Sequence, residues 1–219
     1  SKFYDPEYEA THDNPDKDPY MAFEKDFMRF MLSDGAGAVL VQDHPEGDCP
    51  LKVEWVEMTS YANELPTCMF MASELESSGR LKSWKEFSPE EIKERGVLVG
   101  KQDIRQLKKY IIQYWVDHIE EVLSKHNVKA EEIDYVIPHV SSMFFYEKLN
   151  DEITARGIAL TKKKWFTNLT SVGNIGSAAI YVALDEFIRT NNIKRGQKIL
   201  LLVPESGRFS YGSVLLTAQ

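Results

Sequence analysis

The stretch Asp134-Tyr-Val-Ile-Pro-His139-Val-Ser-Ser142 contains a short apolar run that stops at Pro138 and is followed at once by a histidine. A short apolar run closed by proline predicts a buried strand that ends there, because proline cannot donate to a central sheet ladder. The stretch therefore predicts a strand that presents one histidine, His139, where it ends.

A second stretch, Gly173-Asn174-Ile-Gly-Ser-Ala-Ala179, lies further along the chain. It predicts a turn punctuated by glycine that carries Asn174 and opens a helix over residues 176–190. Two neutral hydrogen-bond donors at the ends of elements are what an enzyme needs to hold a developing oxyanion. We therefore expect the fold to bring His139 and Asn174 together.

The surrounding periodicities predict a layered α/β domain. Helical periodicity marks residues 103–125 and 141–156, and a continuous apolar run at residues 198–203 predicts a strand buried on both faces. Short strands are expected at residues 165–167 and 209–217. The order of elements is thus helix, strand, helix, strand, helix, strand, strand.

The first part of the chain is less regular. Residues 1–20 have the composition of a loop, which fits either a flexible N-terminus or an internal loop of a longer protein. Small residues at 35–38 allow backbones to approach closely and lead into a buried strand over residues 38–41. A nucleotide-phosphate loop is disfavoured there, because no Lys-Ser or Lys-Thr pair follows. Residues 51–61 alternate between apolar and charged side chains, which predicts a half-exposed strand.

Residues 62–100 allow two interpretations. Ser88 and Pro89 predict a helix start, with the serine as N-cap and the proline at the first helical position. The region either lines a substrate tunnel or forms a surface excursion.

Composition excludes several classes of protein. The chain has 219 residues and a net charge of -8, which argues against nucleic acid as a partner. It contains no apolar run of about 18 residues, so no membrane span is expected. Two cysteines and an acidic start without a signal peptide predict a reduced, cytoplasmic protein. The histidines are scattered and no metal-binding spacing is present, so we expect no metal site.

Taken one at a time, the candidate residues have ordinary explanations. His139 after a strand is more often structural than catalytic, and Asn174 between glycines is common turn chemistry. Ser142 is most simply a helix cap. Cys49 lies in an acidic turn and Cys68 has no cationic neighbour, so neither is expected to be a nucleophile. No Gly-x-Ser-x-Gly motif supports a serine hydrolase.

Four segments in order resemble the C-terminal half of β-ketoacyl-ACP synthase III, one of the thiolase-fold condensing enzymes. They are Ser33-Asp-Gly-Ala-Gly-Ala38, Pro138-His139, Gly173-Asn174-Ile-Gly-Ser-Ala-Ala179 and Gly207-Arg-Phe-Ser-Tyr-Gly212. The resemblance implies a thiolase-like layered α/β/α fold in three parts. Residues 1–42 would be the tail end of an N-terminal thiolase-like half, residues 43–100 an insertion or connecting region, and residues 101–219 the C-terminal thiolase-like domain.

The resemblance also implies a chemistry. The family uses a Cys-His-Asn triad, in which the cysteine takes an acyl group from one thioester and a second thioester supplies the carbon nucleophile. His139 and Asn174 would stabilise the enolate or oxyanion, and the backbone N–H of Arg208 would hold the other oxyanion. Ser142 and Phe209 would contact substrate.

The implied reaction is a Claisen-type condensation without a cofactor. Its substrates would be thioesters of CoA or acyl carrier protein, in fatty acid, polyketide or alkylresorcinol-type biosynthesis. The family's cysteine precedes the glycine-rich segment that begins here at Ser33, so no nucleophile is expected in this chain. We expect a missing N-terminal half, a homodimer and no turnover by this chain alone.

Three departures and two alternatives qualify the resemblance. The departures are the missing upstream cysteine, Ser142 where the family usually has asparagine, and Arg208 where it tends to have glycine. Together with the long insertion at residues 43–100 they suggest a specialised relative, such as the enzymes that join two β-ketoacyl chains. The alternatives are a non-catalytic partner subunit and a thioester-binding domain, although the presence of both His139 and Asn174 favours catalysis. Lys162-Lys163-Lys164 is a candidate landing site for an acidic carrier protein, or else a solvated loop.

Overall fold

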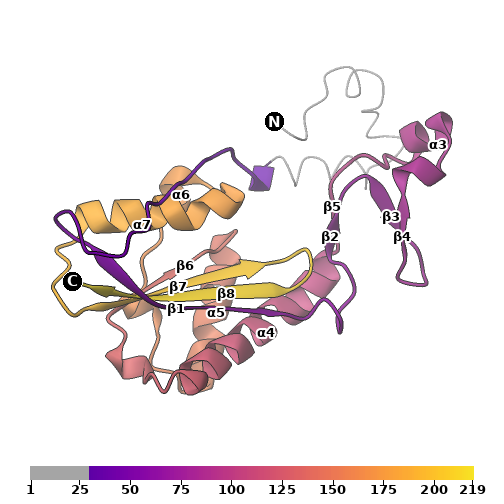
Figure 1. The fold of residues 1–219 in the computed structure, drawn as a ribbon. Coiled ribbons are helices and arrows are strands. Elements are labelled where there is room, and N and C mark those ends of the chain that lie inside the picture. Colours follow the sequence, from indigo (N-terminus) through magenta and orange to yellow (C-terminus); the bar gives the residue numbers. More distant parts are fainter. Residues whose placement is uncertain (1–29) are drawn as a thin grey trace.

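The computed structural model describes residues 30–219. The interpretation of residues 1–20 as a loop, and most of the expected N-terminal remnant, lie outside the described residues. Within them the chain is mixed α/β, as predicted, with one main sheet and helices on both of its faces (Figure 1).

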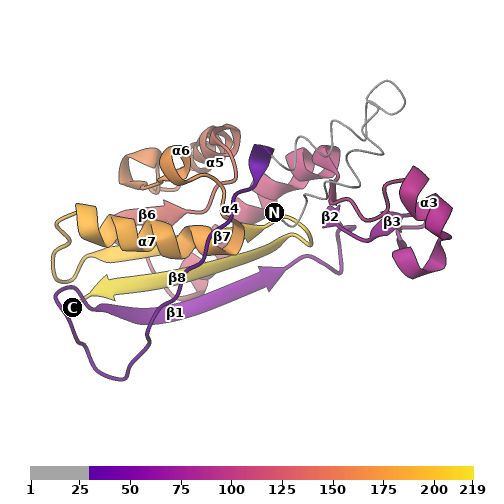
Figure 2. The same ribbon diagram turned by 90° about the horizontal axis from the view of Figure 1, so that it is seen from above.

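The main sheet has four strands in the order β1-β8-β7-β6. Strands β6 (Tyr135–Pro138) and β7 (Lys198–Glu205) run parallel, whereas β8 (Ser210–Ala218) is antiparallel to β7 and to β1 (Leu51–Ser60). Seen from above, the long β1 and β8 lie side by side at one edge (Figure 2). The sheet therefore mixes one parallel pairing with a C-terminal hairpin.

Strand β7 is buried on both faces, as its apolar run predicted. Successive side chains point to opposite faces of a sheet. Ile199 and Leu201 join one apolar cluster, and Leu200 and Leu202 join the other. One strand thus holds the two halves of the core together.

Helices cover the two faces of the sheet. Figure 1 shows α7 (Ala179–Thr190) on one face and α4 (Ile104–Lys125) with α5 (Met143–Ala155) on the other. Leu107, Ile111, Trp115 and Ile119 of α4 share a cluster with Leu200, while Phe187 of α7 packs with Ile137 and Leu201. Asp103 caps α4 by accepting from the N–H groups of Arg105 and Gln106, which explains why this helix begins where predicted.

Short elements complete the described chain. They are β2 (Met69–Phe70), β3 (Ser73–Leu75), β4 (Leu81–Ser83), η1 (Trp84–Glu86), α3 (Pro89–Glu94), β5 (Lys101–Gln102), η2 (Ala130–Glu132), η3 (Lys162–Lys164), α6 (Leu169–Val172) and η4 (Gly176–Ala178). The expected strand at residues 165–167 is reduced to one parallel bridge between Trp165 and Val136. Among residues 30–219 no helix is long and apolar enough to cross a membrane.

The excursion that contains β2 to β5 projects away from the main sheet (Figure 1). Its helix α3 begins with the predicted cap: Glu91 N–H donates to the Ser88 side chain, and Ser88 N–H donates to the Glu91 carboxylate. Residues 51–60 do not belong to this excursion, because β1 pairs with β8 along its length. Strand β1 thus shares a sheet with the C-terminal strands, and the division of the chain into three parts stays a prediction.

The strand predicted at residues 38–41 is absent. These residues form no strand, and Val39, Leu40 and Val41 are 60%, 84% and 76% exposed. A strand needs a partner to satisfy its backbone groups, and no strand of the described chain pairs with this segment. The prediction of a buried strand was therefore wrong for this structure.

His118 is a fully buried polar residue on the inner face of α4. Its Nδ1 lies 3.0 Å from Thr59 Oγ1 on β1, and its Nε2 lies 3.0 Å from Ser213 Oγ on β8. Burial lowers the pKa of His118 from 6.5 to about 4, so the ring is neutral at neutral pH. The ring thus joins a helix to two neighbouring strands.

His118 makes the fold sensitive to acid. The unfolded chain takes up a proton near pH 6.5, whereas the folded chain resists it until about pH 4, so stability is lost as the pH falls through that window. We expect this residue to account for a loss of about 3 kcal/mol in the free energy of unfolding, measured by urea denaturation between pH 7 and pH 4. His118→Gln should remove that component, whereas His44→Gln, at an exposed histidine, should not. An unchanged pH dependence in His118→Gln would contradict the assignment.

Candidate functional site

The candidate site lies at the carboxyl edge of β6 and β7. Because these strands are parallel, their carboxyl ends meet at the same edge of the sheet. The backbone N–H of His139 donates to Leu202 O at 2.8 Å, so the pairing with β7 extends one residue beyond β6. His139 is therefore held on a fixed backbone at the strand end, as predicted.

The turn that carries Asn174 joins α6 to α7. Gly173 has φ +83°, a left-handed conformation that favours glycine, and a Cβ there would come within 2.9 Å of Ser33 Oγ. The Gly176 N–H donates to Asn174 Oδ1 at 3.2 Å, which closes the turn ahead of η4 and α7. Asn174 is 9% exposed. The turn is thus closed by a hydrogen bond of its own and opens a helix, as predicted.

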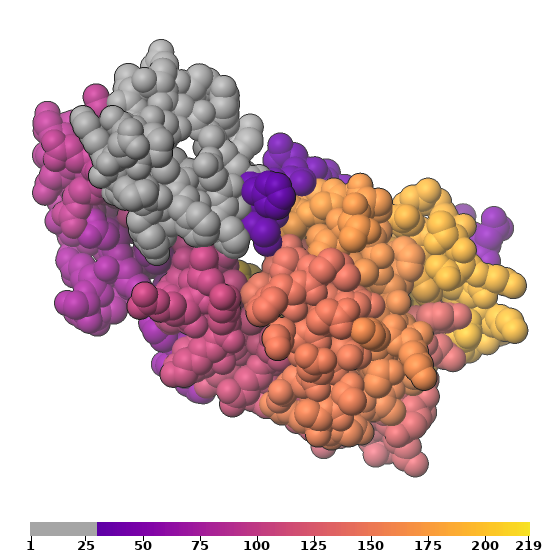
Figure 3. Space-filling model, turned by 180° about the vertical axis from the view of Figure 1, so that it is seen from behind, coloured from indigo at the N-terminus to yellow at the C-terminus, as the bar shows by residue number. Residues whose placement is uncertain are grey.

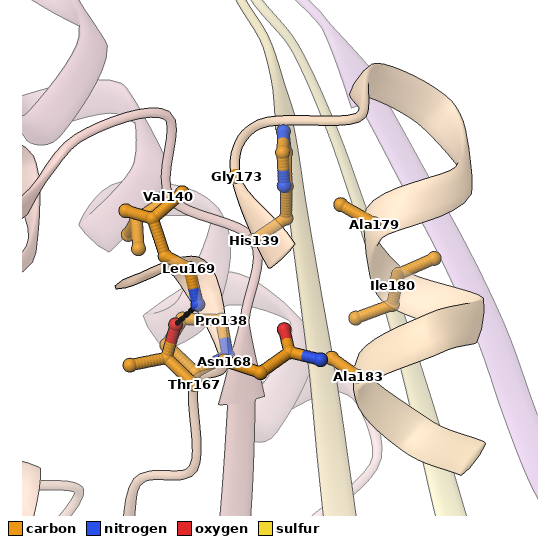
Figure 4. Close-up of a pocket in the computed structure, with 10 residues that line it drawn as sticks. All are labelled: Pro138, His139, Val140, Thr167, Asn168, Leu169, Gly173, Ala179, Ile180 and Ala183. Atoms are coloured by element: carbon orange, nitrogen blue, oxygen red, sulfur yellow. Dashed lines mark hydrogen bonds between the residues drawn. The ribbon is translucent and has the colours of Figure 1, made fainter. Parts of the chain in front are cut away.

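The two stretches meet around one small pocket. Its walls come from the end of β6 with His139, from the segment between Thr167 and Gly173, and from Ala179, Ile180 and Ala183 of α7. In Figure 4 the His139 side chain lies between the Gly173 loop and the first turn of α7. The pocket holds about 20 Å³, which is space for roughly one water molecule. His139 and Gly173, the residue before Asn174, both line the pocket, so the structure brings His139 and the Asn174 turn together. Access of the Asn174 side chain to the pocket stays a prediction.

His139 is suited to donate a hydrogen bond while uncharged. Burial lowers the pKa of the imidazole from its usual 6.5. At neutral pH the ring is therefore neutral and carries one N–H. A neutral donor can stabilise a developing negative charge without exchanging a proton.

The segment Ser33–Gly37 packs closely against the Asn174 turn and α7. Ser33 N–H donates to Asn174 O at 2.8 Å. A Cβ on Gly35 would lie 2.8 Å from Ile175 Cβ, and a Cβ on Gly37 would overlap Tyr181. Seen from behind, the indigo start of the described chain lies against the orange residues of this region (Figure 3). The glycines are therefore explained by close packing at the site.

The loop between β7 and β8 contains the predicted backbone donor, but its amides are already bonded. Arg208 N–H donates to Glu205 Oε2 at 3.0 Å, and Gly207 N–H donates to Glu205 Oε1. Sequence reasoning missed Glu205. The available signal was a carboxylate at the end of a buried strand, two residues before a glycine.

The two predicted substrate-binding residues occupy different environments. The Phe209 side chain is fully buried and lies edge-on to Tyr110, with ring centroids 6.0 Å apart. Ser142 is half-buried at the N-cap position of α5, but its side chain makes no capping bond, which corrects its interpretation as a capping side chain. Contact of either residue with substrate stays a prediction.

Cys68 is confirmed as an unsuitable nucleophile. It is fully buried, and its thiol donates to Asp103 O at 3.3 Å. Burial, with a smaller effect of the Asp103 charge, raises the pKa of the thiol to about 12. Cys49 is half-buried in the segment that precedes β1 and does not line the pocket around His139.

The lysine run at residues 162–164 is largely engaged within the chain. Lys162 Nζ lies 2.8 Å from Glu147, and Lys164 Nζ donates to Ala130 O at 3.1 Å. These bonds favour the ordinary interpretation, a solvated surface loop, over a landing site for a carrier protein.

Comparisons with known proteins point to one family. Residues 123–218 match the family model for the C-terminal region of 3-oxoacyl-[acyl-carrier-protein] synthase III. The chain is 29% identical over 186 residues to the β-ketoacyl-[acyl-carrier-protein] synthase III of Clostridium perfringens, covering 85% of this chain and 52% of that protein.

Solved structures show the same fold. The synthase III of Thermus thermophilus superposes with a TM-score of 0.55 at 15% identity, over 75% of this chain and 46% of that one. AbyA1, a tetronic acid condensing enzyme, gives a TM-score of 0.57 at 16% identity, over 77% of this chain and 46% of that one.

The fold is therefore that of one half of these thiolase-fold structures. In sequence, residues 123–218 are similar to the C-terminal region of β-ketoacyl-ACP synthase III. The chain spans about half the length of the curated relatives it matches.

Cys68 should resist alkylation in the folded chain. With a thiol pKa of about 12, roughly one molecule in ten thousand carries the thiolate at pH 8. We expect iodoacetamide to modify Cys49 and to leave Cys68 intact until urea is added, as read by peptide mass spectrometry. Alkylation of Cys68 as fast as Cys49 in the folded protein would contradict its burial.

Proposed function

We propose that this chain supplies the C-terminal part of the active site of an enzyme that joins two acyl thioesters by Claisen-type condensation. The observation that carries the proposal is the meeting of His139 and the Asn174 turn at one pocket beside α7. Backbone hydrogen bonds hold both residues in place: His139 N–H bonds Leu202 O, and Asn174 O accepts from Ser33 N–H. The family match over residues 123–218 supports the same reaction class.

The roles of the two residues follow from their chemistry. Loss of CO2 or a proton from the second thioester leaves an enolate, whose negative charge gathers on the thioester oxygen. The neutral His139 ring and the Asn174 amide would each donate to that oxygen. Neither residue needs to change its protonation state, which fits a histidine whose pKa is held low by burial.

The acyl group would be held by a cysteine that this chain does not supply. The thiol of Cys68 is buried, with its pKa raised to about 12, and Cys49 does not line the pocket. The nucleophile would come from the N-terminal thiolase-like half, so the chain alone would not turn over. We also propose a homodimer in the cytoplasm, with acyl-CoA or acyl carrier protein as the source of the thioesters.

One observation favours a second candidate, a non-catalytic partner that shapes the pocket. The amides of Gly207 and Arg208 are already bonded to Glu205. A subunit without an oxyanion to hold has no need of free amides there. The presence of His139 and Asn174 together favours the catalytic proposal.

Intact-mass spectrometry after incubation with a panel of acyl-CoA thioesters tests where the acyl group goes. We expect this chain to gain no acyl mass, because its thiols lie outside the pocket, and a polypeptide that carries the upstream cysteine to be acylated. Stoichiometric acylation of Cys49 or Cys68 would contradict the proposal and would require a site built around that cysteine.

His139→Ala, made in the native enzyme that contains this chain, should separate the two half-reactions. Acyl loading of the cysteine should persist, whereas condensation should fall by about 10²- to 10³-fold, because one donor to the enolate oxygen is lost. Asn174→Ala should act in the same direction, and His44→Ala, at an exposed histidine, is the matched control. Unimpaired condensation in His139→Ala would favour the non-catalytic partner.

A further inference from the structure

In the loop that joins β7 to β8, two backbone N–H groups bind the carboxylate of Glu205, and we call this amide pair the cradle. The N–H groups of Gly207 and Arg208 converge on one carboxylate, and each donates to a different oxygen of Glu205. Consecutive amides that point at one centre bind anions, and bonds to a charged acceptor are stronger than neutral ones. The cradle is therefore filled by a group from its own strand.

Glycine at position 207 belongs to this arrangement. A Cβ there would lie 2.6 Å from Glu205 Oε1, so any side chain would push the carboxylate out. Ser206 between them has its own contact, since its hydroxyl accepts from Gln102 Nε2 at 3.1 Å. Glu205 and Gly207 thus specify the occupied cradle together.

The loop backbone is held from outside, without help from Glu205. Cys68 N–H donates to Gly207 O at 2.9 Å, and the Arg208 guanidinium bonds the hydroxyl of Thr67. Tyr61 N–H donates to Phe209 O at 3.0 Å. These contacts keep both amides pointing to the same place when the carboxylate leaves.

Glu205 lies at the surface of the loop. Its side chain is exposed, whereas Gly207 is buried. A rotation about its side-chain bonds returns the carboxylate to water, but the amides cannot follow it. The cradle also lies at the carboxyl edge of β7, the same edge at which His139 leaves β6.

We propose that Glu205 is the resting occupant of the amide pair and that a thioester oxygen replaces it during acyl transfer. Two negative oxygens cannot share one pair of amides, so the carboxylate competes with the developing oxyanion. Glu205 is then a positioning residue that tunes the rate of acyl transfer. This inference rests on the proposed condensing function.

Glu205→Gln tests the exchange, because glutamine keeps the shape and removes the charge. The first measurement is the amide proton shift of Gly207 in the ¹⁵N-glycine-labelled chain, with the signal assigned by Gly207→Ala. We expect it to move upfield in Glu205→Gln and to stay in place in Glu64→Gln, which removes the charge of another exposed glutamate. An unchanged amide proton shift of Gly207 in Glu205→Gln would contradict the bond between Glu205 and the amide pair.

The second measurement is the kcat and KM of acyl transfer in the native enzyme that contains this chain. Because an oxyanion forms in the transition state and not in the bound substrate, Glu205→Gln should raise kcat by about tenfold and leave KM unchanged. A lower or unchanged kcat, with the expected proton shift, would overturn the competition. Absence of acyl transfer in the wild type would overturn the proposed function and the exchange with it, while the proton shift would still report the Glu205 bond.

Discussion

The parallel pairing of β6 with β7 is the constraint on which the candidate site depends. It places His139 and the loop that begins at Glu205 at one edge of the sheet. The bond from His139 N–H to Leu202 O carries the pairing beyond Pro138, so the histidine backbone cannot drift from the strand end. Because side chains of β7 enter both apolar clusters, any shift of this edge would disturb the core on both faces.

The two sides of that edge are supported by different parts of the chain. On one side, α7 and the Asn174 turn are packed against the segment from Ser33, whose amide bonds Asn174 O. On the other side, Thr67 and Cys68 at the base of the excursion hold the loop before β8. The excursion is therefore more than a surface decoration, since its base anchors backbone groups next to the proposed chemistry.

Most elements of the C-terminal domain could be predicted because their signals are local. Apolar periodicity and Asp103 define α4, and the unbroken apolar run defines β7. The strand predicted at residues 38–41 is absent, since a strand depends on a partner that sequence does not reveal. The role of His118 depends on the register of β1 with β8. Glu205 was missed because a carboxylate bonded to nearby amides leaves no periodic pattern.

Gly35 and Gly37 limit which substitutions this sequence can accept during evolution. Each glycine lies against one specific side chain, Ile175 for the first and Tyr181 for the second. A larger residue at either position is tolerable only if its opposite residue becomes smaller. The two stretches are therefore expected to vary as linked pairs over evolutionary time, although they lie more than a hundred residues apart in the chain.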